Sequence, residues 1–319
     1  MTATRLGLTL SSEEHPASRL VGLAALAEAS GFDFVSISDH YHPWVDAQGH
    51  APFVWAVLGA LAERTSAIDV AVGVTCPIMR IHPAVLAQAA ATTGNLLGDR
   101  FTWGVGTGEA LNEHITGVKW PIAPERIAML GEAVEVVRRL WTGERLTFEG
   151  AFFTVENAQI YDPPDHDIPI VVSAFAPRAA EMAGRIGDGL WTEAGGDVVQ
   201  AWRDAGGHGP VYAQVTVCWA PTTDEAVDVA HRMWPNTCVP GQLSQDLPTP
   251  THFEQASSTV TPQMIAAAVP CGPDAGPILA ALRDAVDAGI DHVYLHQIGP
   301  DQEGFCRLWT SEIAPELTR

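Results

Sequence analysis

The stretch Phe34–Trp44, FVSISDHYHPW, is an apolar run that ends in an acid, an imidazole and an indole. A histidine takes or gives a proton near neutral pH, so His40 is a candidate general acid or base. Asp39 precedes it and would point the other way along an extended chain, where it could contact a cofactor. An ordinary solvated loop histidine is the alternative. The position at a strand end and the nearby Trp44 favour catalysis.

A second candidate ends the glycine-rich segment 104–109, GVGTGE. Glycines let a ligand approach the backbone closely, and Glu109 would add a carboxylate at that point. Facing His40 across a pocket, Glu109 would complete an acid and a base on two sides of a substrate. The alternative is a glutamate that only stabilises a helix start. Asn112 follows, and its amide can offer a donor and an acceptor to a heterocycle.

Other polar residues do not form a recognisable site. No histidine or cysteine spacing typical of a metal site occurs, so the sequence predicts no metal. Cys76 falls at an expected strand end without an adjacent basic residue, which favours a lining role over a nucleophilic one.

Strand-like and helix-like segments alternate along the chain and must position these residues. About eight strand–helix units fit a (β/α)8 TIM barrel, in which the carboxyl ends of the strands carry the chemistry. A doubly wound open sheet is the competing fold, but no GxGxxG follows the first strand. The barrel predicts one pocket formed by five strand ends: 39–40, 73–76, 107–109, 173–176 and 191–193.

Composition supports one domain over residues 1–319, since no shift in composition marks a boundary. Insertions are expected near 110–122, 144–165 and 235–262. The second should be a hairpin, and the third is Pro-rich. With no long apolar run or leader pattern, the chain is expected to be cytoplasmic and to have no membrane partner.

The net charge of the chain further restricts which classes of partner it can bind. The formal net charge is -21, and Lys119 is the only lysine. Nucleic acid is therefore not expected as a partner. Any phosphate would have to bind backbone N–H groups, hydroxyls or a few arginines.

The motifs, in their order, resemble the luciferase-like superfamily of flavin and deazaflavin oxidoreductases. The most similar branch is that of the glucose-6-phosphate dehydrogenases that use coenzyme F420, an 8-hydroxy-5-deazaflavin. The segments that carry the resemblance are SDHYHPW (38–44), GHAPFVW (49–55), RIHPAVLAQAAAT (80–92), GVGTGEALNEHITG (104–117), ERIAMLGEAVEVVRRLWTG (125–143) and AGRIGDGLW (183–191).

The resemblance implies a homodimer of barrels with F420 as cofactor and a hydride passing between substrate and C5 of the ring. His40 would be the general base and Glu109 the proton partner. It also implies a non-prolyl cis peptide at Gly73-Val74. The implied cofactor-binding residues are Asp39, Gly73, Val74, Cys76, Thr107, Gly108, Asn112, Phe175, Ala176, Arg178 and Ala179. The implied substrate-binding residues are Glu13, Trp44 and Glu193.

Departures from that branch bear on the substrate. The branch holds its sugar phosphate with two lysines and an arginine. Here Gly196 and Ala268 occupy two of those positions, and the third has no counterpart. Each charge-assisted hydrogen bond lost is worth about 1.5–3 kcal/mol. The expected substrate is therefore a neutral alcohol or carbonyl compound and not glucose 6-phosphate.

Phe175 stands where the branch has glycine, which leaves FMN open as an alternative cofactor. An FMN-dependent oxidoreductase or monooxygenase is then the second hypothesis. A non-catalytic flavin-binding protein is the third, and the presence of Asp39, His40, Glu109 and Asn112 together argues against it.

Overall fold

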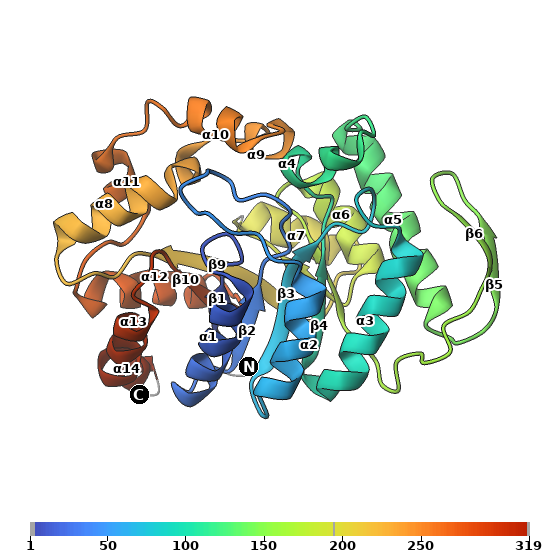
Figure 1. Cartoon of the computed structure of the whole chain (residues 1–319), viewed down its shortest axis with the longest axis horizontal. Helices are drawn as coiled ribbons and strands as arrows, with labels where there is room; N and C mark the ends of the chain where they lie inside the picture. The colour runs from blue at the N-terminus through green and yellow to red at the C-terminus, as the bar shows by residue number, and fades with distance from the viewer. Residues whose placement is uncertain (1–3, 194, 318–319) are drawn as a thin grey trace.

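The chain forms a closed barrel of parallel strands (Figure 1). The computed structural model describes residues 4–193 and 195–317. Around the barrel the neighbours are β1, β10, β9, β8, β7, β4, β3 and β2. These strands are β1 Arg5–Leu10, β2 Phe34–Ile37, β3 Asp69–Thr75, β4 Phe101–Val105, β7 Ile170–Ser173, β8 Gly189–Trp191, β9 Val211–Val217 and β10 His292–Gln297. The predicted TIM barrel is confirmed, and the open-sheet alternative is wrong because the eight paired strands form a closed ring without edge strands.

Helices connect the strands and cover the outside of the barrel (Figure 1). Ala- and Leu-rich faces such as that of α1, with Leu20, Leu23, Ala24 and Ala27 buried, pack against it. The covering helices are α1 Ala17–Ala29, α2 Val54–Arg64, α3 Pro83–Leu97, α5 Ala123–Leu140, α6 Pro177–Ile186, α7 Gly196–Asp204, α12 Ala275–Asp287, α13 Gln302–Leu308 and α14 Ala314–Leu317.

Aromatic side chains fill the barrel interior. Trp191 stacks on Tyr212 with ring centroids 4.8 Å apart, and its Nε1 donates a hydrogen bond of 2.6 Å to the Tyr294 hydroxyl. Gly73 lies against this cluster, where an added Cβ would collide with the Trp191 ring. The peptide Gly73-Val74 is cis, as expected. Since the interior is filled, a ligand must bind above it, at an end of the barrel.

Two of the expected insertions are short. Residues 110–122 contain α4 Ala110–Glu113 and a single turn of 3-10 helix from His114 to Thr116. The expected hairpin is confirmed: β5 Leu146–Glu149 pairs antiparallel with β6 Thr154–Ala158, outside the barrel sheet.

The third insertion is helical and stands beside the barrel mouth. After α8 Thr223–Met233 come α9 Leu243–Asp246, α10 Pro250–Ala256 and α11 Pro262–Ala268. Pro250 and Pro262 each open a helix whose preceding threonine caps a backbone N–H, which explains how a Pro-rich stretch forms helices. A small core of its own holds this segment to the ends of β9 and β10: Cys218, Ala220, Ala226, Ala230, Val260, Ile265, Val269 and Ile298.

Candidate active site

His40 and Glu109 come together at the mouth of the barrel, as expected. His40 follows β2, and Glu109 follows β4 and directly precedes α4. The amide nitrogen of Asn112 lies 3.2 Å from His40 Nδ1 and donates to Glu109 Oε2 at 3.3 Å. One amide therefore joins the two candidate catalytic side chains.

Asn112 is fixed by the backbone of the loop after β2. Its Oδ1 accepts hydrogen bonds from the N–H groups of Tyr41 (2.9 Å) and His42 (3.2 Å). These two donors leave Nδ2 to face His40 and Glu109. The residue is only 2% exposed. Both polar atoms of this side chain have protein partners, and the expected role of Asn112 in cofactor binding stays a prediction.

The partner of His40 is Glu13, from the segment after β1. His40 Nε2 lies 3.3 Å from Glu13 Oε1, and both side chains are largely buried. Ser38 Oγ (2.6 Å) and Ser11 Oγ (3.0 Å) donate to Glu13 Oε2. Burial raises the pKa of Glu13, but the His40 charge and the Ser38 hydrogen bond outweigh it and hold the pKa below its usual value. Glu13 is thus a carboxylate that faces an imidazole.

The two nitrogens of His40 both face acceptors. Nδ1 lies 3.1 Å from the carbonyl oxygen of His42, while Nε2 faces Glu13. The His42 carbonyl and the Asn112 amide both lie within hydrogen-bond distance of Nδ1, which leaves Nε2 to exchange a proton with Glu13 or with a ligand. The Trp44 ring, whose centroid is 5.0 Å from that of His40, covers one side of the imidazole.

Trp44 is held by the helical insertion. Phe253 of α10 meets its ring edge-on, with centroids 5.0 Å apart, and Gln48 Oε1 accepts from its backbone N–H at 2.8 Å. The insertion therefore forms part of the wall next to the expected substrate site.

Asp39 belongs to an internal ion pair. Its carboxylate is fully enclosed, and Oδ1 accepts a 2.8 Å hydrogen bond from Arg80 Nη2. Glu113 Oε2 accepts from the backbone N–H of Arg80 at 2.7 Å, and its Oε1 lies 3.5 Å from Arg80 Nε. Burial raises the pKa of Glu113 to about 7. Arg80 binds only Oδ1, and Oδ2 is buried without a hydrogen-bond partner among the described residues, so the expected contact of Asp39 with a cofactor stays a prediction.

Cys76 and Gly108 pack against each other beneath the same turn. Gly108 has φ +69°, and a Cβ there would lie 2.5 Å from Cys76 Sγ. Burial raises the pKa of the Cys76 thiol well above its usual value. A neutral thiol agrees with the lining role and not with a nucleophile.

The remaining expected cofactor residues lie at neighbouring strand ends. Gly73, Val74 and Thr107 are half-buried around the mouth. Phe175, Ala176 and Arg178 are exposed and Ala179 is half-buried, where β7 passes into α6. Ala176 precedes α6 without a side-chain cap, so the first N–H groups of that helix have no side-chain acceptor from that position.

A second imidazole–carboxylate pair lies beside the first. His296 Nε2 is 2.9 Å from Glu14 Oε1, which also accepts from Trp234 Nε1 at 2.7 Å. Glu14 Oε2 accepts from the Gly299 N–H at 2.7 Å. Consecutive carboxylates after β1, Glu13 and Glu14, thus bind histidines from β2 and β10 respectively.

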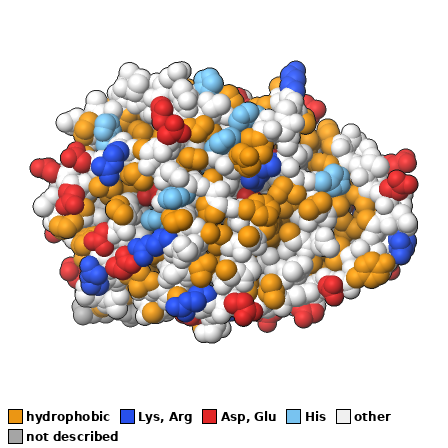
Figure 2. Space-filling model, in the orientation of Figure 1, with side chains coloured by type: hydrophobic (Ala, Val, Ile, Leu, Met, Phe, Trp, Pro, Cys, Tyr) orange, Lys and Arg blue, Asp and Glu red, His pale blue; other side chains and the backbone are white. Residues whose placement is uncertain are grey.

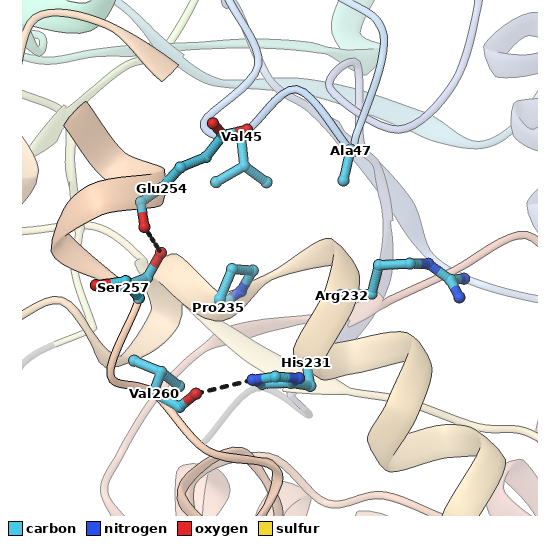
Figure 3. Close-up of a pocket in the computed structure, with 9 residues that line it drawn as sticks. Val45, Ala47, His231, Arg232, Pro235, Glu254, Ser257 and Val260 are labelled. Carbon is cyan, nitrogen blue, oxygen red and sulfur yellow. Dashed lines mark hydrogen bonds between the residues drawn. The ribbon is translucent and has the colours of Figure 1, made fainter. Parts of the chain in front are cut away.

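A surface hollow of about 250 Å³ lies between the loop after β2 and the helical insertion (Figure 3). Val45, His231, Arg232 and Glu254 are among its lining residues. His231 Nε2 lies 2.8 Å from the Val260 carbonyl oxygen, so its imidazole is already engaged. None of the candidate catalytic residues borders this hollow.

Sequence reasoning missed Arg80, Glu113, Glu14 and His296. Arg80 and Glu113 lie within the segments that carry the family resemblance, but nothing in their spacing shows that they meet. Only the fold brings β3, β4 and the loop after β2 to one point. Within residues 4–193 and 195–317, no group of three or more His, Cys, Asp or Glu side chains could hold a metal ion. No helix in the same ranges has the length and apolarity needed to cross a membrane.

The structure is an α/β barrel that holds His40 between the carboxylates of Glu13 and Glu109 at its mouth. A family model described as luciferase-like monooxygenase matches residues 1–292, and the chain belongs to this family. The expected superfamily is thereby confirmed.

Two curated relatives are F420-dependent glucose-6-phosphate dehydrogenases. That of Microbacterium testaceum (strain StLB037) is 35% identical, with 99% of this chain and 98% of the relative covered. That of Mycolicibacterium gilvum (strain PYR-GCK) is 36% identical, with 100% and 99% covered. Among solved structures, an F420-dependent secondary alcohol dehydrogenase in complex with an F420–acetone adduct superposes with a TM-score of 0.91, at 29% identity and 99% coverage of both chains.

Proposed function

We propose that this protein is an F420-dependent oxidoreductase that transfers a hydride between a neutral alcohol or carbonyl substrate and the deazaflavin. The observation that carries the proposal is the contact of His40 with Glu13 on one side and, through Asn112, with Glu109 on the other. Oxidation of an alcohol needs a group that removes the hydroxyl proton as hydride leaves the carbon, and this pair provides one.

The residues at the mouth fit the cofactor. The cis peptide Gly73-Val74 and the turn at Gly108 are half-buried at the ends of β3 and β4, where a flat ring could pack against their backbone. The uncapped start of α6, with Arg178 in its first turn, suits an anionic tail. Bound deazaflavin supplies a two-electron hydride acceptor or donor at its ring.

His40 acts on the substrate oxygen. In alcohol oxidation its Nε2 accepts the hydroxyl proton once the proton between His40 and Glu13 has moved to the carboxylate. In carbonyl reduction the doubly protonated ring donates from Nε2. Glu109, held by Asn112, is the second proton site at the mouth.

The site favours a neutral substrate over a phosphate. Arg80 and Arg126 are the arginines whose charges reach this region, and both are buried and bound by protein groups. Gly196 and Ala268 add no charge. A phosphate dianion would therefore meet the carboxylates of Glu13 and Glu109 without a cation to balance it.

The test is a set of assays on the purified protein with F420 and simple secondary alcohols or ketones. We expect oxidation of the alcohol to bleach F420 absorbance and fluorescence, and glucose 6-phosphate to give no turnover. Turnover of glucose 6-phosphate at a rate similar to that of the alcohols would overturn the substrate assignment.

FMN is the second candidate cofactor, and only one observation favours it. The Phe175 side chain is 50% exposed at the start of α6, where it occupies space that a longer anionic tail would need. Titration of the same protein with F420 and with FMN separates the two, and tighter binding of FMN would favour the flavin-dependent alternative.

We also propose that the chain forms a homodimer. An apolar groove runs between α1 and α2, lined by residues including Val21, Pro52, Phe53 and Ala56, and Phe53 is 55% exposed. Figure 2 shows hydrophobic side chains gathered over the centre and right of this face. Light scattering on the purified protein tests the proposal, and a monomer mass at all concentrations would refute it.

A further inference from the structure

Cys218 and Cys271 lie side by side where the helical insertion joins the barrel. Cys218 directly follows β9, and Cys271 follows α11. The Cys218 N–H donates to the Pro270 carbonyl oxygen at 2.9 Å, and the Gly272 N–H donates to the Cys218 carbonyl oxygen at 3.0 Å. These two hydrogen bonds flank Cys271 and pair it with Cys218 as in a parallel sheet. The backbone therefore sets two free thiols opposite each other.

This backbone pairing satisfies the distance requirement for a disulfide. Paired residues on neighbouring extended segments lie about 4.7–4.9 Å apart. A disulfide needs Cα atoms about 4.4–6.8 Å apart. The two thiols also interact directly: their hydrogen bond raises the pKa of Cys218, which burial raises further, and lowers the pKa of Cys271.

The two thiols differ in their access to solvent. Cys218 is 1% exposed, and its Sγ donates to the Ile298 carbonyl oxygen at 3.5 Å. Cys271 is half-buried. The thiolate is the reactive form of a cysteine, and its exposure decides whether an oxidant reaches it. Cys271 is therefore the thiol that reacts first, and Cys218 is placed to react with it afterwards.

A bond between these residues would close the base of the helical insertion. The chain between them forms α8, α9, α10 and α11, and α8 packs beside α11 (Figure 1). Gly272 lies against Thr223, the first residue of α8, where an added Cβ would be 2.9 Å from the Thr223 hydroxyl oxygen. Both ends of the insertion thus meet at one point. A covalent link there restricts the opening of the whole segment.

Packing alone is the alternative explanation, because a free cysteine behaves as a small apolar side chain. Cys218 belongs to the small core of the insertion, and Cys271 and Cys238 pack against it. Packing accounts for each of these cysteines singly. It does not require Cys271 to stand directly opposite Cys218, in backbone register with it.

We propose that Cys218 and Cys271 form a reversible disulfide that ties the helical insertion to the end of β9 and restrains its opening. The oxidant is hydrogen peroxide, and the reductant is a dithiol. This bond would form whether or not the protein uses F420.

The reaction has two steps. The Cys271 thiolate attacks one oxygen of the peroxide, the O–O bond breaks, and hydroxide leaves, which gives a sulfenic acid at Cys271. The Cys218 sulfur then attacks the Cys271 sulfur, an S–S bond forms, and the hydroxyl group leaves as water with the Cys218 proton. Together the two sulfur atoms lose two electrons, and the peroxide is reduced to two molecules of water. A dithiol reverses the reaction by thiol–disulfide exchange.

The test treats the reduced whole chain with hydrogen peroxide, blocks the remaining thiols with N-ethylmaleimide and maps disulfides by mass spectrometry after digestion. We expect a bond between the Cys218 and Cys271 peptides that dithiothreitol removes. Cys218→Ser should accumulate sulfenic acid at Cys271, which dimedone traps, whereas Cys271→Ser should leave Cys218 unmodified. Cys238→Ser is the matched control from the same small core and should form the bond as the wild type does.

Limited proteolysis measures the effect on the insertion. Protease should cut residues 223–268 at least about tenfold more slowly in the oxidised wild type than in the reduced one, and peroxide should make no difference in Cys271→Ser. Equal cleavage of the oxidised and reduced wild type would refute the restraint. Absence of the Cys218–Cys271 bond after peroxide treatment, or an equal yield of bonds to Cys238, would overturn the proposal. Oxidation that continues to sulfinic acid at Cys271 would overturn it as well, because Cys218 would then not reach the sulfenic acid in time.

Discussion

His40 and Glu109 contact the same amide nitrogen, that of Asn112, at 3.2 and 3.3 Å. The two residues are far apart in sequence, and each ends a different barrel strand. The Asn112 oxygen accepts hydrogen bonds from two N–H groups of the loop after β2. One side chain therefore fixes the conformation of this loop and also the distance between the two candidate proton-transfer groups.

A pair of substitutions at Asn112 separates these two functions. Asn112→Asp keeps an acceptor for the loop N–H groups but replaces the donor to Glu109 with a like charge, so turnover should fall while the melting temperature changes little. Asn112→Ala removes both, and each unpaired N–H costs about 1–3 kcal/mol. Thermal unfolding and steady-state kinetics check this, and an Asn112→Asp enzyme of normal activity would contradict it.

His40→Ala should reduce turnover by about 10²–10⁴-fold, the range for a positioned proton transfer. Glu13→Gln should give a smaller loss, since it removes the acceptor behind the imidazole but keeps the imidazole. F420 affinity, measured by fluorescence titration, should stay close to that of the wild type in both. His208→Ala, at an exposed histidine, is the control. Near-normal turnover of His40→Ala would show that His40 is an ordinary loop histidine without a catalytic role.

Arg80→Met should destabilise the protein by about 3–5 kcal/mol, because it leaves the buried carboxylates of Asp39 and Glu113 without a cation. The surface pair of Arg138 and Asp188 gives a matched control, and Arg138→Met should cost about 1 kcal/mol or less. Urea unfolding measures both. Similar losses in the two variants would show that Arg80 is not an internal counter-ion.

The raised pKa of Glu113, about 7, predicts a pH-dependent stability. Folding strengthens proton binding by this carboxyl, so its contribution is fully present below the usual glutamate pKa. That contribution is lost as pH rises through about 7. Glu113→Gln should remove this part of the pH dependence, so that the difference in unfolding free energy between variant and wild type grows from pH 5 to pH 8. A difference that stays constant with pH would contradict the assignment.

Much of the architecture follows from local patterns. The alternation of apolar strands with Ala/Leu helices predicts the barrel, and Glu149-Gly150 predicts the hairpin that β5 and β6 form. Strand ends in a barrel share one face, so His40 and Glu109 could be paired from sequence position alone. The cis peptide at Gly73-Val74 came from family resemblance and from no local pattern.

The partners of these residues could not be predicted, because they depend on contacts between strands. For Asp39, only a role at the cofactor was expected, and nothing in its position along the chain showed that Arg80 would bind one oxygen of its carboxylate. The glycines of segment 104–109 were expected to let a ligand approach the backbone, but at Gly108 the Cys76 side chain already occupies the space that a Cβ would need. In each case the decisive contact is made by a residue that is distant in sequence. Local sequence patterns do not show which distant residues come into contact.

The helical insertion is attached to the barrel through a small core of its own, separate from the main one. Segments with independent cores can open separately, and amide hydrogen exchange would then show α8 to α11 exchanging together while the barrel strands stay protected. The Trp44 indole packs against Phe253 of this segment. Natural variation could therefore reshape one wall of the mouth without disturbing the proton-transfer groups, which belong to the barrel.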